Sequence, residues 1–217
     1  DFPTIFQRIN QLTTVDLSAF YADVSKDRLY TFAPAASERR SAQTAMYLIA
    51  DGLARLIAPI LPVTADEMWR YLPGQREGSV HLAEFPARER VEALLDRTVS
   101  ARWDRLIAIR DEVNRKLESA RQGKAIGNSL GARVSVRAGG ATAALLEPSR
   151  DDLPMLFIVS QVTLEIVEGS EDALSIDVAR AEGHKCARCW RIVDAISPAG
   201  ETEGLCERCV ASVPKAA

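Results

Sequence analysis

Four cysteines in the last part of the chain have the spacing of a metal site. Cys186 and Cys189 form one Cys-x2-Cys pair, Cys206 and Cys209 form a second, and sixteen residues separate the two pairs. Two cysteines with two residues between them can direct both sulfurs to one tetrahedral ion. Four soft thiolates favour Zn²⁺ and leave no coordination position for water or a substrate. The spacing therefore predicts one structural zinc ion.

Other uses of these cysteines fit the sequence less well. A secreted disulfide framework is disfavoured, because all four cysteines lie in one short segment and no signal peptide is visible. A thioredoxin-like pair would follow a strand in a βαβ unit. Mononuclear iron uses similar paired cysteines and stays an alternative.

The only two histidines, His81 and His184, are far apart in the sequence, which leaves little material for a histidine-based catalytic centre.

Basic residues surround the tryptophan that follows the first cysteine pair. Lys185, Arg188 and Arg191 flank Trp190. A tryptophan beside cations can stack on an unpaired base while the cations meet phosphate. Packing of Trp190 over the zinc site is an equally open interpretation of the same residues.

The net charge of −3 is unevenly distributed along the chain. Residues 97–124 hold eight Lys and Arg against four acids, and residues 138–182 hold two Arg against nine acids. The first segment can provide an electrostatic track for nucleic-acid phosphates, with the acidic segment as a spacer. The alternative is a solvated helix face with i, i+4 ion pairs. The candidate phosphate-contacting cations on this helix are Arg102, Arg105, Arg115, Lys116 and Arg121.

Hydrophobic periodicity predicts a mainly α fold: a helical bundle, a small α+β unit and a C-terminal four-cysteine zinc module. Helical spacing covers residues 14–30, 37–58, 62–72 and 89–123, strand-like alternation covers 132–136, 162–167 and 174–178, and two helical patches lie at 143–146 and 153–159.

Four segments are expected along the chain. They are a helical domain (1–88), a long basic helix with a connector (89–128), an acidic α+β unit (129–182) and the zinc module (183–217). The longest apolar stretch, around 56–63, contains Pro59 and Pro62 and is too short for a membrane span. The start at Asp1, without Met, predicts a fragment of a longer protein.

The sequence resembles the carboxy-terminal part of bacterial-type isoleucyl-tRNA synthetases. The similarity covers nearly the whole chain in the expected order. The matching stretches are DLSAFYADVSKDRLYTF (16–32), RRSAQTAMYLIADGLARLIAPILPVTADEMWRYLPG (39–74), VNRKLESARQGKAIGNSLGARV (113–134), GHKCARCW (183–190) and CERC (206–209). The second stretch also resembles the anticodon-binding domains of the valine and leucine enzymes. The third stretch and the zinc module point to the isoleucine enzyme.

This resemblance implies an intact ligase that uses ATP and Mg²⁺ to attach isoleucine to tRNA(Ile) in the cytoplasm. The HIGH and KMSKS signatures of the catalytic domain do not occur in this sequence, and the editing domain is absent as well. The chain is therefore expected to bind tRNA on the anticodon side and to be inactive alone. A monomer that contacts neither membrane nor DNA is expected.

Two other functional classes share features with this sequence. A DNA-repair glycosylase also ends in a four-cysteine finger, but it would need a helix-two-turn-helix segment before the finger and an N-terminal proline. An acidic α+β unit precedes the finger here, and the chain opens with Asp1. A freestanding zinc-containing RNA-binding protein, or a synthetase paralogue, stays an alternative.

Overall fold

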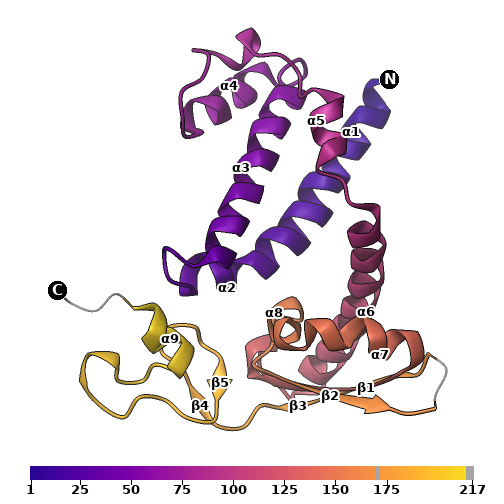
Figure 1. Ribbon diagram of the computed structural model, residues 1–217, viewed down its shortest axis with the longest axis vertical. Coiled ribbons are helices and arrows are strands. Elements are labelled where there is room, and N and C mark those ends of the chain that lie inside the picture. Colours follow the sequence, from indigo (N-terminus) through magenta and orange to yellow (C-terminus); the bar gives the residue numbers. More distant parts are fainter. Residues whose placement is uncertain (170–171, 214–217) are drawn as a thin grey trace. The chain divides into compact units, whose positions relative to one another are not determined.

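The computed structural model describes residues 1–169 and 172–213 (Figure 1). The chain forms two compact units: a first unit of Asp1–Ala33 with Ala101–Ala217, and a second unit of Pro34–Ser100. Among the described residues, no helix is both long enough and apolar enough to cross a membrane. The division into four segments expected from the sequence stays a prediction.

The first unit begins with one uninterrupted helical segment. It consists of α1 (Phe2–Asn10), η1 (Gln11–Ala22) and α2 (Asp23–Thr31), and the residues at both junctions keep right-handed helical angles. The middle part, η1, has the wider turns of a π-helix. Asp1 caps the start by accepting a hydrogen bond from the Thr4 amide, and the backbone becomes extended at Phe32. The predicted helix over 14–30 is therefore part of a longer one.

A three-stranded sheet forms the α+β part of the first unit. The strands are β1 (Ala132–Gly139), β2 (Gln161–Val167) and β3 (Leu174–Arg180), in the order β2-β1-β3. The central strand β1 pairs parallel to β2 and antiparallel to β3. A parallel pair needs a crossover connection, which α7 (Gly140–Leu146), η4 (Glu147–Asp152) and α8 (Leu153–Leu156) provide.

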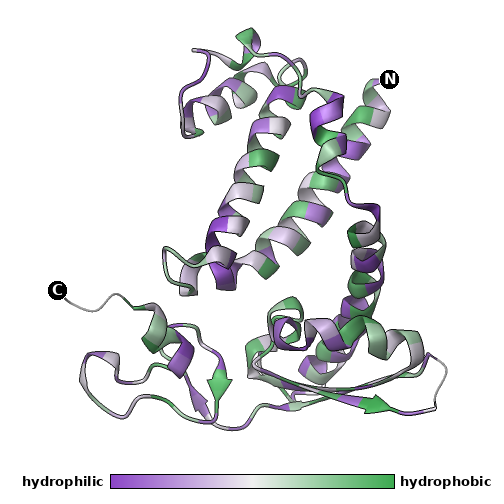
Figure 2. Ribbon diagram, in the orientation of Figure 1, coloured by the Kyte–Doolittle hydropathy of each residue, from purple (hydrophilic) through white to green (hydrophobic). Residues whose placement is uncertain are grey.

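The main core of the first unit lies between this sheet and its helices. Alternate residues of β1, including Val134 and Val136, are fully buried, as the period of two in a strand requires. Helix α6 (Arg97–Gln122) packs an apolar stripe against the same core, formed by Leu106, Ile109, Val113 and Leu117. Figure 2 shows hydrophilic and hydrophobic residues intermixed along α6, as expected for a helix with one buried face.

Two predicted helix boundaries were wrong. The segment 89–123 is not one helix, because α5 (Arg88–Ala93) ends before α6 begins at Arg97. The carboxylate of Asp96 accepts hydrogen bonds from the amides of Thr98 and Val99, so Asp96 starts a new helix instead of continuing the old one. The patch predicted to reach Val159 ends with α8 at Leu156, because Ile158 has a left-handed φ of 55°.

The second unit is built from α3 (Ser37–Ile57), α4 (Pro62–Tyr71), η2 (Val80–Leu82) and α5. Pro62 opens α4, where proline is favoured because the first helical amide needs no partner. Trp69 of α4 is only 1% exposed, and its indole N–H donates a hydrogen bond to the Glu77 carbonyl over 2.8 Å. This tryptophan anchors the core of the unit.

The last part of the first unit is a small module around the four cysteines. Strands β4 (His184–Lys185) and β5 (Ile192–Val193) form an antiparallel hairpin, followed by η5 (Gly200–Thr202) and α9 (Glu207–Ser212). Gly183 leads into the hairpin with φ at 122°, and a Cβ atom there would lie 2.3 Å from the Val193 carbonyl oxygen. Only glycine fits where the backbone comes this close to the Val193 carbonyl.

The fold class expected from the sequence, mainly α with a small α+β unit and a four-cysteine module, is confirmed.

Candidate metal centre and nucleic-acid interface

The four cysteines converge on one point inside the module. Cys186 and Cys209 are fully buried, and Cys189 and Cys206 are 9% and 6% exposed. Their four Sγ atoms all lie within 4.8 Å of one another, and the Cys189 and Cys206 sulfurs are 3.7 Å apart. All four are free cysteines, without disulfide bonds. Among the described residues, this is the one cluster of at least three His, Cys, Asp or Glu with metal-site geometry.

Backbone turns hold the sulfurs in place. In the first knuckle, the Trp190 amide donates to the Cys186 carbonyl over 3.0 Å, and the Cys186 amide donates to the Arg191 carbonyl over 2.9 Å. The second pair approaches through Cys206, whose amide donates to the Cys186 sulfur over 3.3 Å. The turns thus bring two pairs that are distant in sequence to one centre.

The protein environment shifts the pKa values of the thiols in opposite directions. Burial acts to raise the pKa of Cys186, but the amides of Cys189, Cys206 and Arg188 stabilise its thiolate and lower the pKa to about 6. Burial raises the pKa of Cys209 to about 12, although the side chain of Arg188 opposes this shift. A bound cation would favour the thiolate form of these sulfurs.

The donor set fits a zinc ion. A tetrahedron with Zn–S bonds of ~2.3 Å has sulfur–sulfur edges of roughly 3.8 Å, close to the 3.7 Å between Cys189 and Cys206. Thiolates are soft ligands and suit this metal. Four protein ligands fill a tetrahedral shell, so the site can stabilise structure but offers no position for a reacting molecule.

Trp190 projects from the metal knuckle. It is 61% exposed, and the Lys185 ammonium lies 5.7 Å from the centre of its ring. Its φ of 65° is left-handed, which is costly for a residue with a large side chain. Neither burial of the ring nor a favourable backbone conformation explains a tryptophan at this position. The exposure favours an aromatic surface for a ligand over simple packing on the cysteine cluster.

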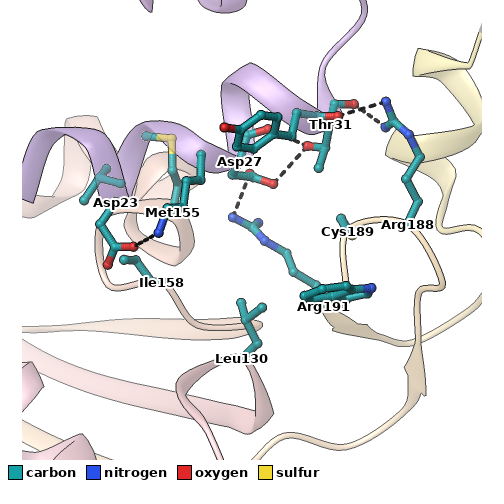
Figure 3. Close-up of a pocket in the computed structure, with 13 residues that line it drawn as sticks. Asp23, Asp27, Thr31, Leu130, Met155, Ile158, Arg188, Cys189 and Arg191 are labelled. Atoms are coloured by element: carbon teal, nitrogen blue, oxygen red, sulfur yellow. Dashed lines mark hydrogen bonds and ion pairs between the residues drawn. The ribbon is translucent and has the colours of Figure 1, made fainter. Parts of the chain in front are cut away.

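The arginines beside Trp190 contact the end of α2. The guanidinium of Arg188 donates to the backbone carbonyls of Thr31 and Tyr30, the latter over 3.3 Å. Arg191 donates to the carboxylate of Asp27 over 3.0 Å, and both of these side chains are less than one-fifth exposed. Figure 3 shows Arg188 and Arg191 reaching α2 from the knuckle.

A cavity of about 400 Å³ lies between α2 and the metal module. Its lining includes the apolar side chains of Leu130 and Ile158 and the aromatic residues Tyr30 and Trp190. Tyr30 is 73% exposed. Ile158, like Trp190, adopts a left-handed φ. Strained backbone at two lining residues is typical of a functional site.

The five candidate cations on α6 are all exposed, but they differ in their partners. Arg115 pairs with Glu112, and Arg121 pairs with Glu118 over 2.7 Å. Arg102 donates to the Ser149 hydroxyl over 2.5 Å. Arg105 and Lys116 form no ion pair within residues 1–169 and 172–213. Lys116 and Arg105 are therefore the most available of the five for phosphate.

Sequence reasoning missed Asp27 and Arg208. Asp27 accepts hydrogen bonds from Arg191 and, through both oxygens, from Arg208. Burial acts to raise the pKa of Asp27, but the hydrogen bond from Arg208 and the charges of both arginines lower it below its ordinary value of 3.8. The two residues are 181 positions apart, and no local pattern links them. Both lie in stretches, 16–32 and 206–209, that carry the resemblance noted above.

Two family profiles match the chain. The profile described as "Anticodon-binding domain of tRNA ligase" covers residues 1–136, and the one described as "Zinc finger found in FPG and IleRS" covers residues 183–211. The finger description names two groups of proteins, so the longer match decides between them. The chain belongs to the anticodon-binding domain family of tRNA ligases.

Curated relatives of this anticodon-binding family member are isoleucine–tRNA ligases. Identity is 44% over 220 residues with the enzyme from Syntrophotalea carbinolica, covering 97% of this chain and 23% of the relative. It is 41% over 221 residues with the enzyme from Geobacter sulfurreducens and 40% over 220 residues with that from Bacillus mycoides, each covering 98% of this chain and 24% of the relative. The chain thus spans about a quarter of the length of these relatives.

These matches bear directly on the expectations from the sequence. The resemblance to isoleucyl-tRNA synthetases is confirmed, and so is the similarity to the anticodon-binding domains of these ligases. The finger profile and the buried four-cysteine cluster together support zinc binding by this family member. The role of each individual residue stays a prediction.

Proposed function

We propose that this chain is the anticodon-side, tRNA-binding part of an isoleucine–tRNA ligase. The observation that carries the proposal is the match over 97–98% of the chain to isoleucine–tRNA ligases, which includes both the anticodon-binding profile and the finger. In the whole ligase, ATP and Mg²⁺ would act in regions outside this chain. The partner would be tRNA(Ile), bound by a monomer in the cytoplasm.

In this proposal the four cysteines hold one structural zinc. Cys186, Cys189, Cys206 and Cys209 would each supply a thiolate, and the ion would supply most of the folding free energy of a module too small for its own core. The convergence of the four sulfurs supports this role. No further ligand would be needed.

The RNA contacts would come from two surfaces, one that binds phosphates by charge and one that binds a base by stacking. Exposed cations of α6, chiefly Arg105 and Lys116, with Arg102, Arg115 and Arg121 less available, would neutralise backbone phosphates. Trp190, with Lys185 beside it, would stack on an unpaired base, and the cavity between α2 and the module gives that base further apolar surface. Arg188 and Arg191 would support this surface.

The proposal is tested by binding of labelled tRNA(Ile) and tRNA(Val) to the 217-residue chain at two salt concentrations. We expect tighter binding of tRNA(Ile), and a log–log salt slope of about 0.7–0.9 per neutralised phosphate. Isoleucine-dependent pyrophosphate exchange by the same preparation should stay at background. Equal affinity for both tRNAs at both salt concentrations would contradict anticodon-side recognition by this chain.

A further inference from the structure

The carboxylate of Asp27 is the point at which α2 holds the metal module. Arg208 approaches it with two parallel hydrogen bonds, Nη1 to Oδ2 over 2.6 Å and Nη2 to Oδ1 over 2.8 Å. Arg191 adds a third, at 3.0 Å to Oδ2, and the Thr31 hydroxyl a fourth, at 2.9 Å to Oδ1. The side chain of Asp27 is 18% exposed. A carboxylate in this setting fixes two arginines in position and direction.

Two arginines of the module directly precede cysteines in the chain and also contact α2. Arg208 precedes Cys209, and its guanidinium lies 5.2 Å from the centre of the Phe32 ring. Arg188 precedes Cys189 and donates to the last carbonyls of α2. A cation is favoured at the carboxyl end of a helix, where the carbonyls lack helical partners. Each arginine thus links a cysteine-bearing turn to the helix.

The charges of this cluster balance when zinc is bound. A zinc ion with four thiolates carries two net negative charges, and Asp27 adds a third. Arg188, Arg191 and Arg208 supply three positive charges. Removing the carboxylate would leave one positive charge of the cluster unbalanced and would take the direct partner from Arg191 and Arg208, which is costly for partly buried guanidinium groups.

We propose that Asp27 is a positioning residue for the metal module, and that zinc retention and the order of the last turn of α2 are coupled through Arg191 and Arg208. The proposal rests on zinc binding at the four cysteines. Arg188 and Arg191 then act on RNA by holding Trp190 in place, and contribute little to phosphate contact. Because coupling between two sites is reciprocal, loosening α2 weakens zinc retention, and removing zinc loosens α2.

The first test measures zinc release from the full chain to a competing chelator. Asp27→Asn keeps the size of the side chain and removes its charge, and it should speed zinc loss by roughly tenfold or more, the range for residues that support metal ligands. Asp23→Asn is the matched control: Asp23 lies one turn earlier on α2 and pairs only with Lys26 at 2.8 Å among the described ion pairs. Its zinc release should equal that of the unaltered chain.

The second test measures amide exchange in α2 with and without zinc. Removal of zinc should raise the exchange of residues 28–32 and leave residues 134–138 of the central strand unchanged. Asp27→Asn should raise the exchange of the same helix residues with zinc still bound. Equal zinc release by the two Asp variants, together with unchanged exchange at 28–32, would overturn the proposal.

Two further variants separate positioning from general stability. Asp27→Glu keeps the carboxylate and should restore most of the zinc retention. Arg208→Lys keeps the charge but loses the two-point contact, and combined with Asp27→Asn it should add little to the single change. If Asp27→Asn does not fold, Arg208→Lys alone decides, since unchanged zinc release would refute the coupling. A chain that binds no zinc at all would instead refute the metal site proposed above.

Discussion

Trp69 and Trp190 both lie near arginines, yet their surroundings differ in every other respect. Trp69 is 1% exposed, and the guanidinium groups of Arg55 and Arg76 lie 4.7 and 4.5 Å from its ring. Trp190 is 61% exposed, while its neighbour Arg191 contacts Asp27 instead of the ring. An arginine beside a tryptophan therefore does not by itself indicate ligand recognition, and only the exposed ring of Trp190 could meet the stacking role proposed for it.

The difference follows from how each region is stabilised. The second unit buries Trp69 among helices, and Asp51 accepts hydrogen bonds from both arginines, which compensates part of their positive charge. The metal module has too few apolar residues to bury a tryptophan, so metal ligation takes the place of a core. A module held by a metal can present a large aromatic residue to solvent without losing its fold.

The largest effect is expected from loss of the metal. Cys189→Ser should reduce zinc from one ion per chain to none, and residues 183–213 should lose their structure while the transition of the second unit is unchanged. Elemental analysis and amide exchange measure the two outcomes. His184→Ala, in strand β4 of the same hairpin but outside the cysteine cluster, should keep its zinc. Retention of a full zinc equivalent by Cys189→Ser would show that another ligand completes the site.

The next largest effect is expected from the buried tryptophan. Trp69→Ala should destabilise the second unit by about 3–5 kcal/mol, because it removes a filled core position and two ring–cation contacts. Chemical denaturation followed by circular dichroism measures the loss. Zinc content should not change. A loss below about 1 kcal/mol would mean that the region around Trp69 repacks, and would weaken the contrast with Trp190.

Trp190→Ala should act on RNA binding and spare stability. We expect weaker tRNA binding by about 1–3 kcal/mol, with the salt slope nearly constant, because stacking neutralises no phosphate. Trp190→Phe keeps an aromatic face and should retain part of the affinity. Zinc content serves as the control for folding. Normal binding by a zinc-loaded Trp190→Ala chain would show that this ring only packs.

The smallest effects are expected on α6. Lys116→Ala should lower the magnitude of the salt slope by about 0.7–0.9 and weaken all tRNAs alike. Arg115→Ala should have a smaller effect, because its guanidinium already pairs with Glu112. Titrations at several salt concentrations compare the two. An unchanged slope for both variants would favour a solvated helix face and leave recognition to the metal module.

The sequence predicted what depends on local spacing. The cysteine pairs, the strands and most helices follow from residues that are neighbours in the chain, and the structure contains them. The break between α5 and α6 was missed because the apolar spacing runs on through Leu94 and Leu95, whereas the Asp96 side chain caps a new helix. Ile158 was placed in a helix because a β-branched residue gives no sign of a left-handed φ.

The features that decide the site depend on long-range contacts. Nothing near Trp190 in the sequence distinguishes an exposed ring from a buried one, so packing and stacking stayed equally open. The contact between Asp27 and Arg208 joins two stretches that look unrelated, and no local pattern indicates a role for either residue. A carboxylate with charged neighbours nearby in sequence would ordinarily be assigned to an i, i+4 pair.

The separation of 181 residues between Asp27 and Arg208 also has a kinetic consequence. At a synthesis rate of roughly 5–20 residues per second, α2 leaves the ribosome on the order of 10–40 s before the arginine that holds it. The sheet, whose strands lie between them in sequence, can pair during that interval. We therefore expect the contact between Asp27 and Arg208 to form at the end of folding, when the module binds its metal and docks on α2, because the two residues are so far apart in sequence. Until then the last turn of α2 is without this partner, and we expect a growing chain to be open to proteolysis there.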